Sequence, residues 1–173
     1  MAFQGRVMLS TTVFVEVVTN LSGAGVTAGA HRLFAHRSYK ATTPLKVLLA
    51  VLYSFSGQYS LLLWTAWHRI HHKFTDTDAD PHNSTRGFFY SHIGWLFTYD
   101  HANFMEHYDK VDMSDLENDP IVMFHDKYYV FIHLIWVYII PTLIPCAAHL
   151  WGYKPYDTSI SATDSKILGH LSG

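Results

Sequence analysis

The stretch VLLAVLYSFSGQYSLLLWTAWHRIHH, residues 47 to 72, joins an apolar run to a group of histidines. Its first part, Val47 to Trp67, has 21 residues without a charge, enough to cross a bilayer as one helix. The middle of the run is a polar notch made of Ser54, Ser56, Gly57, Gln58 and Ser60. Non-helical backbone is tolerated at membrane depth only where protein or water satisfies it, and such side chains supply partners. We therefore predict that 47–67 is a re-entrant or surface helix with its bend at the notch.

Two histidine boxes flank this run. In the second box, His68, His71 and His72 are spaced i, i+3 and i+4, which puts their imidazoles on one face of a helix within reach of a common centre. In the first box, His31 and His36 lie about 140° apart around an α-helix, so they share a centre only if the helix ends or bends between them. A run that crossed the membrane would hold the boxes roughly 30 Å apart. The re-entrant prediction places both boxes on one side, around one metal pocket.

Neutral imidazole is the commonest protein ligand for transition metals, and a group without cysteine suits iron, zinc or copper. The single cysteine, Cys146, excludes a disulfide framework and a thiolate cage, which favours a reducing, cytosolic environment for the boxes. Clustered imidazoles repel one another when protonated, so their grouping needs a reason. The remaining histidines are expected at ordinary surface or interface positions: His82, His92, His101, His107, His125, His133 and His170.

Length and composition indicate one domain, and the long apolar runs indicate that it is mostly helical and embedded in a membrane. The 173 residues are 49% hydrophobic, and the 12 Lys and Arg residues are scattered, so we expect no nucleic-acid partner. We expect a membrane helix in 1–30 that leads into the first box, where only Glu16 is charged after residue 6 and Gly23, Gly25 and Gly29 allow close helix packing.

The rest of the chain divides by charge. Residues 31–127 are expected to form a cytosolic or interfacial region, in which the aromatic segment 87–99 is an interfacial or buried helix. Residues 128–151 carry no charge and are the strongest candidate for a membrane helix. A loose polar tail is expected over 152–173.

Three segments resemble one known family. They are GAHRLFAHRSYK (29–40), HRIHHKFTDTDADPHNSTRGFFYSHIGWL (68–96) and AAHLWGYKPYD (147–157), and all are similar to the membrane-bound acyl-CoA desaturases of the stearoyl-CoA desaturase type. The resemblance implies an integral membrane enzyme of the endoplasmic reticulum, multi-pass, with its histidine boxes facing the cytosol. Such an enzyme introduces a cis double bond into a fatty acyl-CoA, consuming O₂ and two electrons that arrive through cytochrome b5.

The resemblance also implies a di-iron centre. His31, His36, His68 and His72 match ligands of one iron, and His71 and His149 match ligands of the other. Chemistry agrees, because removing hydrogen from an unactivated methylene needs an oxidant made from O₂, which redox-inert zinc does not provide.

At the substrate-binding positions, some residues match the family and others depart from it. Gln58 and Trp64 match positions near the acyl tunnel, and Arg69 is a candidate partner for substrate phosphates. Ala66-Trp67 and Tyr99-Asp100 stand where the family carries Arg-Asp and Arg-Lys, which help to hold the CoA head group.

The family's His-Asn-Tyr-His-His box does not occur up to Gly173, so we expect this chain to be a partial form that is inactive alone. Two alternatives stay open. One is another histidine-box membrane oxygenase, a hydroxylase or lipid desaturase. The other is a non-catalytic truncated membrane protein.

Overall fold

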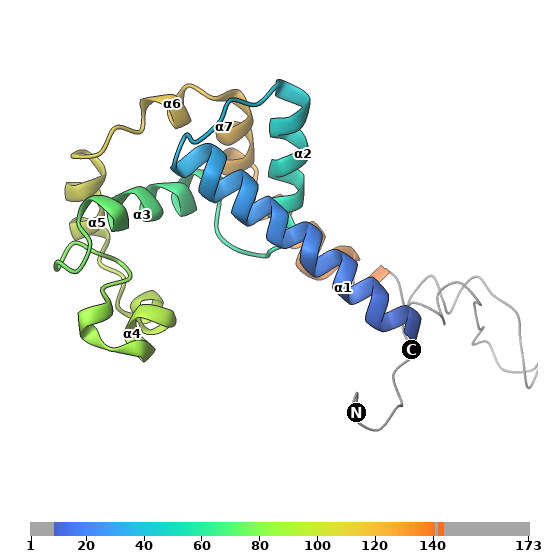
Figure 1. Cartoon of the computed structure of the whole chain (residues 1–173), viewed down its shortest axis with the longest axis horizontal. Coiled ribbons are helices and arrows are strands. Elements are labelled where there is room, and N and C mark those ends of the chain that lie inside the picture. The colour runs from blue at the N-terminus through green and yellow to red at the C-terminus, as the bar shows by residue number, and fades with distance from the viewer. Residues whose placement is uncertain (1–8, 141, 144–173) are drawn as a thin grey trace, which may run out of the picture.

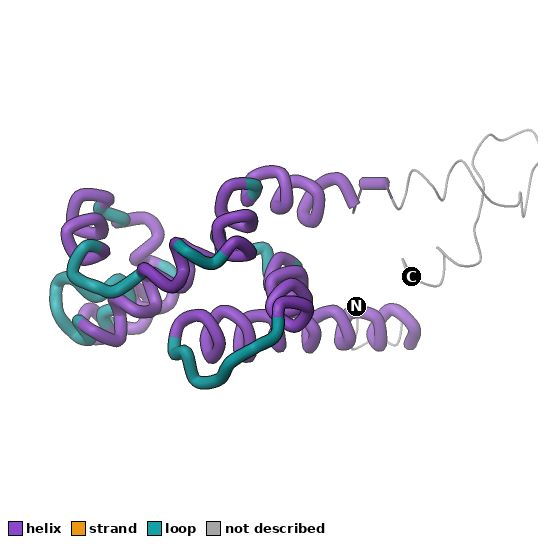
Figure 2. The backbone as a smooth tube through the Cα atoms, turned by 90° about the horizontal axis from the view of Figure 1, so that it is seen from above, coloured by secondary structure: helices purple, strands orange, loops and turns teal. Residues whose placement is uncertain are grey.

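The computed structural model describes residues 9–140 and 142–143. Every regular element in these residues is a helix, and no strand occurs among them (Figure 2). The prediction of an all-α fold is thus confirmed for this part of the chain. The predicted ligand His149, the predicted tail 152–173 and the end of the predicted helix 128–151 lie outside the described residues.

A long rod begins the fold. Helix α1 (Leu9–Ala24) continues without a break into η2 (Gly25–Ala35), and together they form the diagonal helix of Figure 1. Within the described residues, one segment, Thr12–Ala35, is long and apolar enough to cross a membrane. Side chains such as Val13, Phe14 and Val17 are exposed along it, as expected where lipid covers a helix.

The run 47–67 is divided between two helices. Helix α2 (Thr43–Ser54) has Pro44 in its first turn, where a missing N–H costs nothing, and α3 (Leu61–Lys73) starts after a break at 55–60. The break coincides with the polar notch. Gly57 adopts a φ of 65° there, and the Tyr53 hydroxyl donates to the carbonyl of Tyr59, 2.7 Å away, across the turn. The chain therefore changes direction at the notch, while its depth in a membrane stays a prediction.

Glycine permits the close crossing of η2 and α2. A Cβ on Gly25 would clash with the backbone of Leu52 and Tyr53, and one on Gly29 would come within 3.2 Å of the Leu49 Cβ. Gly23 has open space around it. Two of the three predicted packing glycines therefore lie at the helix contact.

Shorter helices follow α3. They are η3 (Ser84–Arg86), α4 (Phe88–His92), η4 (Gly94–Thr98), α5 (His101–Tyr108), α6 (Ser114–Glu117), α7 (Pro120–Lys127), α8 (Tyr129–Leu134) and η5 (Ile135–Ile139). The aromatic segment 87–99 forms α4 and η4 rather than one helix, and Phe88 and Phe97 are exposed. The alternative of a buried helix is therefore wrong for this segment.

Helix α3 lies at the centre of the packed core. Its residues Ala66 and Ile70 belong to one cluster with Phe34 of η2, Tyr53 of α2 and Val122 of α7. Burial on several sides fixes both the position and the rotation of α3, and hence the directions in which its histidines point.

Candidate metal centre

The pitch of η2 brings the first histidine pair together. This segment is a π-helix, in which each N–H bonds to the carbonyl five residues earlier, and the His36 N–H bonds to the His31 carbonyl at 2.9 Å. Residues five apart therefore stack on one face. The expectation that the helix ends or bends between the two histidines is met differently: the helix widens, and it ends at Ala35.

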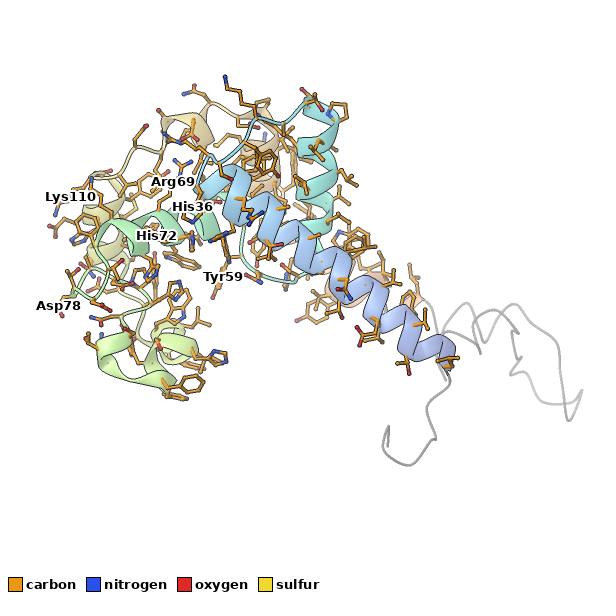
Figure 3. All side chains as sticks on the ribbon, viewed as in Figure 1. His36, Tyr59, Arg69, His72, Asp78 and Lys110 are labelled. Carbon is orange, nitrogen blue, oxygen red and sulfur yellow. The ribbon has the colours of Figure 1, made fainter. Side chains whose placement is uncertain are left out.

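Helix α3 supplies two more imidazoles to the same point. The Nε2 atom of His36 lies 3.1 Å from Nε2 of His31 and 3.2 Å from Nε2 of His68, which lies 3.1 Å from Nε2 of His72. One nitrogen from each of the four lies within 4.8 Å of all the others. Figure 3 shows His36 and His72 between the end of η2 and α3.

These distances fit ligands of one ion. Two nitrogens about 2.1 Å from a metal lie about 3.0 Å apart when their bonds meet at a right angle and about 3.4 Å apart at the tetrahedral angle. Hydrogen bonding satisfies the arrangement poorly, because a neutral ring with a proton on Nε2 has only one proton for all its Nε2 neighbours. A cavity of about 440 Å³, lined by His36, His68 and His72, leaves the centre open on one side.

Burial and mutual repulsion keep three imidazoles of the cluster neutral, those of His36, His68 and His72. The pKa of His68 is lowered to about 3, first by burial and then by the neighbouring imidazoles of His72, His31, His36 and His71. Burial is also the main cause that lowers the pKa of His36 and His72. Neutral imidazole is the form that binds metals, so these three residues are ready to act as ligands at neutral pH.

His71 turns to a different environment. Its Nδ1 donates to the Oδ1 atom of Asp80 at 2.7 Å, and Asp80 is buried and held by the backbone N–H groups of Asp76 and His82. A carboxylate on Nδ1 fixes the tautomer in which Nε2 is the ligating nitrogen. His71 therefore lies apart from the four converging imidazoles, although the spacing of the second box allowed a common centre. Its assignment to a second ion stays a prediction.

The candidate substrate residues separate into two groups. Gln58, Trp64 and His68 line a common cavity of about 410 Å³, and the Trp64 indole stacks on the His68 imidazole with ring centroids 5.1 Å apart. Arg69 is buried instead, with a bidentate pair to Asp115 at 2.8 Å and a bond to the Phe34 carbonyl at 2.5 Å. These contacts connect α3 to η2 and α6, and a contact of Arg69 with substrate stays a prediction.

Two features of this region escaped the sequence pattern. The Arg69 and Asp115 pair joins residues 46 positions apart, and spacing alone gives no sign of such a contact. His125 is buried in the core at 4% exposure, so the expected surface or interface position is wrong for this residue. The signal available for His125 was its place in the amphipathic helix 120–127, next to buried Val122.

Comparison with curated proteins gives consistent relatives, although no family model matches the chain. The chain is 42% identical to the Delta(9)-fatty-acid desaturase fat-7 of Caenorhabditis elegans, with 90% of this chain and 55% of the relative aligned. It is 42% identical to the acyl-CoA Delta-9 desaturase of Acheta domesticus, over 91% of this chain and 52% of the relative. It is 49% identical to stearoyl-CoA desaturase 5 of Bos taurus, over 86% of this chain and 53% of the relative.

The chain spans about half the length of the curated relatives it matches. The similarity extends over about nine-tenths of its own length, well beyond the histidine boxes, and the relatives are oxidoreductases of lipid metabolism. With the four converging imidazoles, these identities show that the chain belongs to the family of acyl-CoA desaturases of the delta-9, stearoyl-CoA type.

Proposed function

We propose that the protein is an acyl-CoA desaturase that introduces a cis double bond into a saturated fatty acyl chain at a di-iron centre. The observation that carries this proposal is the convergence of the Nε2 atoms of His31, His36, His68 and His72 within a chain homologous to such enzymes. In this proposal the four histidines hold one iron, and His71 together with His149 belongs to the second.

The donor set fits iron. Four imidazoles, with successive Nε2 atoms 3.1–3.2 Å apart, leave room for a further ligand on the open side. Iron would supply the activation of O₂ that zinc lacks. The acyl chain would give two hydrogens, and two electrons from cytochrome b5 together with two protons would complete the reduction of O₂ to two molecules of water. The chain's own contribution is to hold the four imidazoles in position, to keep those of His36, His68 and His72 neutral, and to exclude water from part of the site.

The cavity beside His68 supports a place for the acyl chain. Trp64 and Trp95 provide apolar walls, and Gln58 provides a polar contact. We assign Gln58 and Trp64 to substrate binding on this basis. The relatives named as acyl-CoA desaturases support acyl-CoA as the substrate, and their membrane-bound family supports a place in the endoplasmic reticulum membrane with both boxes facing the cytosol.

A yeast strain without its own desaturase tests the activity. The protein encoded by the full transcript that contains this sequence should allow growth without added oleate and yield monounsaturated fatty acids. The His36→Ala and His68→Ala variants should fail although they are produced at the same level. If the cells contain the membrane-inserted, iron-loaded wild-type protein but form no monounsaturated fatty acid of their own, the proposal is contradicted.

One observation favours a second candidate, a lipid desaturase that uses another acyl carrier. A cavity of about 250 Å³ shares Trp67 and Trp95 with the cavity beside His68, and its charged lining residues are Asp78, Asp80, Asp100 and Arg86. Carboxylates outnumber cations there, and the guanidinium of Arg86 lies 3.7 Å from the ring centroid of Tyr90. Phosphates of CoA would meet net negative charge.

Labelled substrates separate the two candidates. Microsomes that contain the protein receive stearoyl-CoA in one reaction and stearoyl-phosphatidylcholine in another, with acyl exchange blocked. Product from stearoyl-CoA alone supports the first candidate, and product from the phospholipid alone supports the second.

A further inference from the structure

His125 is a buried histidine that belongs to no part of the proposed metal centre. It lies on α7, with Tyr53 and Ser54 of α2, the start of α3 and Tyr129 of α8 around it. The ring also borders an apolar cavity of about 480 Å³. An imidazole placed in such surroundings needs hydrogen-bond partners for both nitrogens.

Its partners fix its tautomer. The backbone N–H of Leu61 donates to Nδ1 at 3.2 Å, so Nδ1 carries the lone pair and Nε2 carries the proton. Nε2 then donates to the Ser54 hydroxyl, 3.1 Å away, and that hydroxyl donates to the Ala50 carbonyl at 2.9 Å. This direction excludes a nucleophilic pair, because Nε2 has no lone pair with which to take a proton from Ser54.

The Leu61 N–H is the first donor of α3. The first N–H groups of a helix have no carbonyl partner inside that helix. The break at 55–60 separates α3 from α2, so these N–H groups need partners from elsewhere in the fold. Ser60 accepts from the Leu63 N–H at 3.2 Å and donates to Asp126 at 2.5 Å. Two adjacent residues of α7, His125 and Asp126, therefore hold two adjacent residues at the start of α3.

The start of α3 determines where its histidines lie. His68 follows Leu61 by seven residues, about two turns, and His72 follows one turn later. If α3 turned by about 20° around its axis, an imidazole about 5 Å from the axis would move by about 2 Å. Such a shift would spoil the 3.2 Å contact between Nε2 of His68 and Nε2 of His36 at the end of η2.

We propose that His125 is a positioning residue for the metal centre: it fastens the N-terminus of α3, and its protonation releases that fastening. A protonated ring carries N–H on both nitrogens, so Nδ1 would face the Leu61 N–H as donor against donor. Asp126 is the charged neighbour on the same helix, whereas α2, α3 and α8 present the hydroxyls of Ser54 and Tyr53, a backbone amide and the ring of Tyr129. Burial lowers the pKa of His125, against the opposing influence of Asp126.

The proposal rests on the metal site proposed above, and Co²⁺ titration of the full chain in detergent tests both. His125→Leu should weaken Co²⁺ binding at pH 7.5 about tenfold, the size of effect seen when a residue that orients ligands is lost. His125→Gln should bind within about threefold of wild type, because an amide oxygen accepts from Leu61 and an amide N–H donates to Ser54. His101→Gln, on exposed His101 of α5, is the matched control.

The pH dependence distinguishes positioning from mere stability. Wild type should lose Co²⁺ at a higher pH than His125→Gln, because glutamine keeps both hydrogen bonds and does not titrate. Hydrogen exchange gives a readout without metal. Because the pKa of His125 is lowered, amides at 61–63 should lose protection in wild type as the pH falls below about 6.5, and keep it in His125→Gln, after correction for intrinsic rates. This measurement needs only variants that preserve both bonds, so it holds even if the leucine variant fails to fold.

The outcomes are separable. Absence of Co²⁺ binding by wild type at pH 7.5 would contradict the metal site itself. Normal binding by wild type together with equal affinity in His125→Leu, or with one shared pH midpoint for wild type and His125→Gln, would overturn the positioning role alone.

Discussion

His68 is the histidine of the cluster whose protonation is hardest. Its pKa of about 3 in the folded chain compares with about 6.5 for an ordinary histidine, because of burial and four neighbouring imidazoles. Between these two values the unfolded chain binds the extra proton and the folded chain does not. Stability of the metal-free protein should therefore fall as the pH drops from about 6.5 toward 3.

Thermal unfolding in detergent with a chelator checks this sign. The unfolding temperature of wild type should decrease from pH 7 to pH 5, and His68→Gln should show a shallower decrease. His101→Gln should follow wild type. An equal slope in His68→Gln would show that the dependence comes from other groups.

Arg69 is a second residue whose surroundings affect the stability of the fold. Its buried guanidinium binds Asp115 and the carbonyls of Phe34 and Asp112 at once, a geometry that lysine cannot reproduce. Arg69→Lys should lower the free energy of unfolding by about 1–3 kcal/mol. Denaturant titration measures it, with exposed Arg32→Lys as control, and similar losses in the two variants would count against the assigned role.

At the level of elements, the contact of η2 with α2 depends on the missing side chain of Gly25. Gly25→Ala would push a methyl group into the backbone of Leu52 and Tyr53, so the helices must separate. We expect the free energy of unfolding to fall by about 1–3 kcal/mol and Co²⁺ binding to weaken, because η2 carries His31 and leads directly into His36.

Gly23→Ala is the matched control, since a Cβ there meets nothing within 4 Å. Alanine also favours a helix, so this variant should be neutral or slightly more stable. Urea titration of both variants makes the comparison. If the two alanines behaved alike, the close crossing would not be a source of stability.

Sequence patterns predicted some elements well and others poorly, for physical reasons. Hydrophobic periodicity and the polar notch indicated helices and a bend, because both are local properties of 47–67. The π pitch of 25–35 was not predicted, because an apolar helical pattern does not distinguish a π-helix from an α-helix. The spacing of the second box alone could not separate His71 from His68 and His72, because the direction of His71 depends on Asp80 in the following loop. The burial of His125 depends on packing against α2 and α3.

For the whole molecule, the cluster constrains the topology in a membrane. His36 and His68 approach within 3.2 Å, so the segments that follow them lie on one side of any bilayer that the chain enters. Cysteines introduced at exposed Lys40 and Asp78, in a Cys146→Ser background, should react from the same side of sealed microsomes. An impermeant maleimide measures this, and detergent-opened microsomes show that both cysteines are reactive. Labelling from opposite sides would exclude the shared centre.

The five-residue interval between His31 and His36 matches the winding of the π-helix at 25–35. In an ordinary α-helix, paired ligands stand three or four residues apart, and a search for that interval would pass over this box. In this chain the H-x-x-x-x-H interval coincides with the wider i→i+5 backbone. Deleting one residue between the two histidines would leave them four residues apart. An ordinary α-helix would then keep the pair on one face, and the π-helix of 25–35 would no longer be needed.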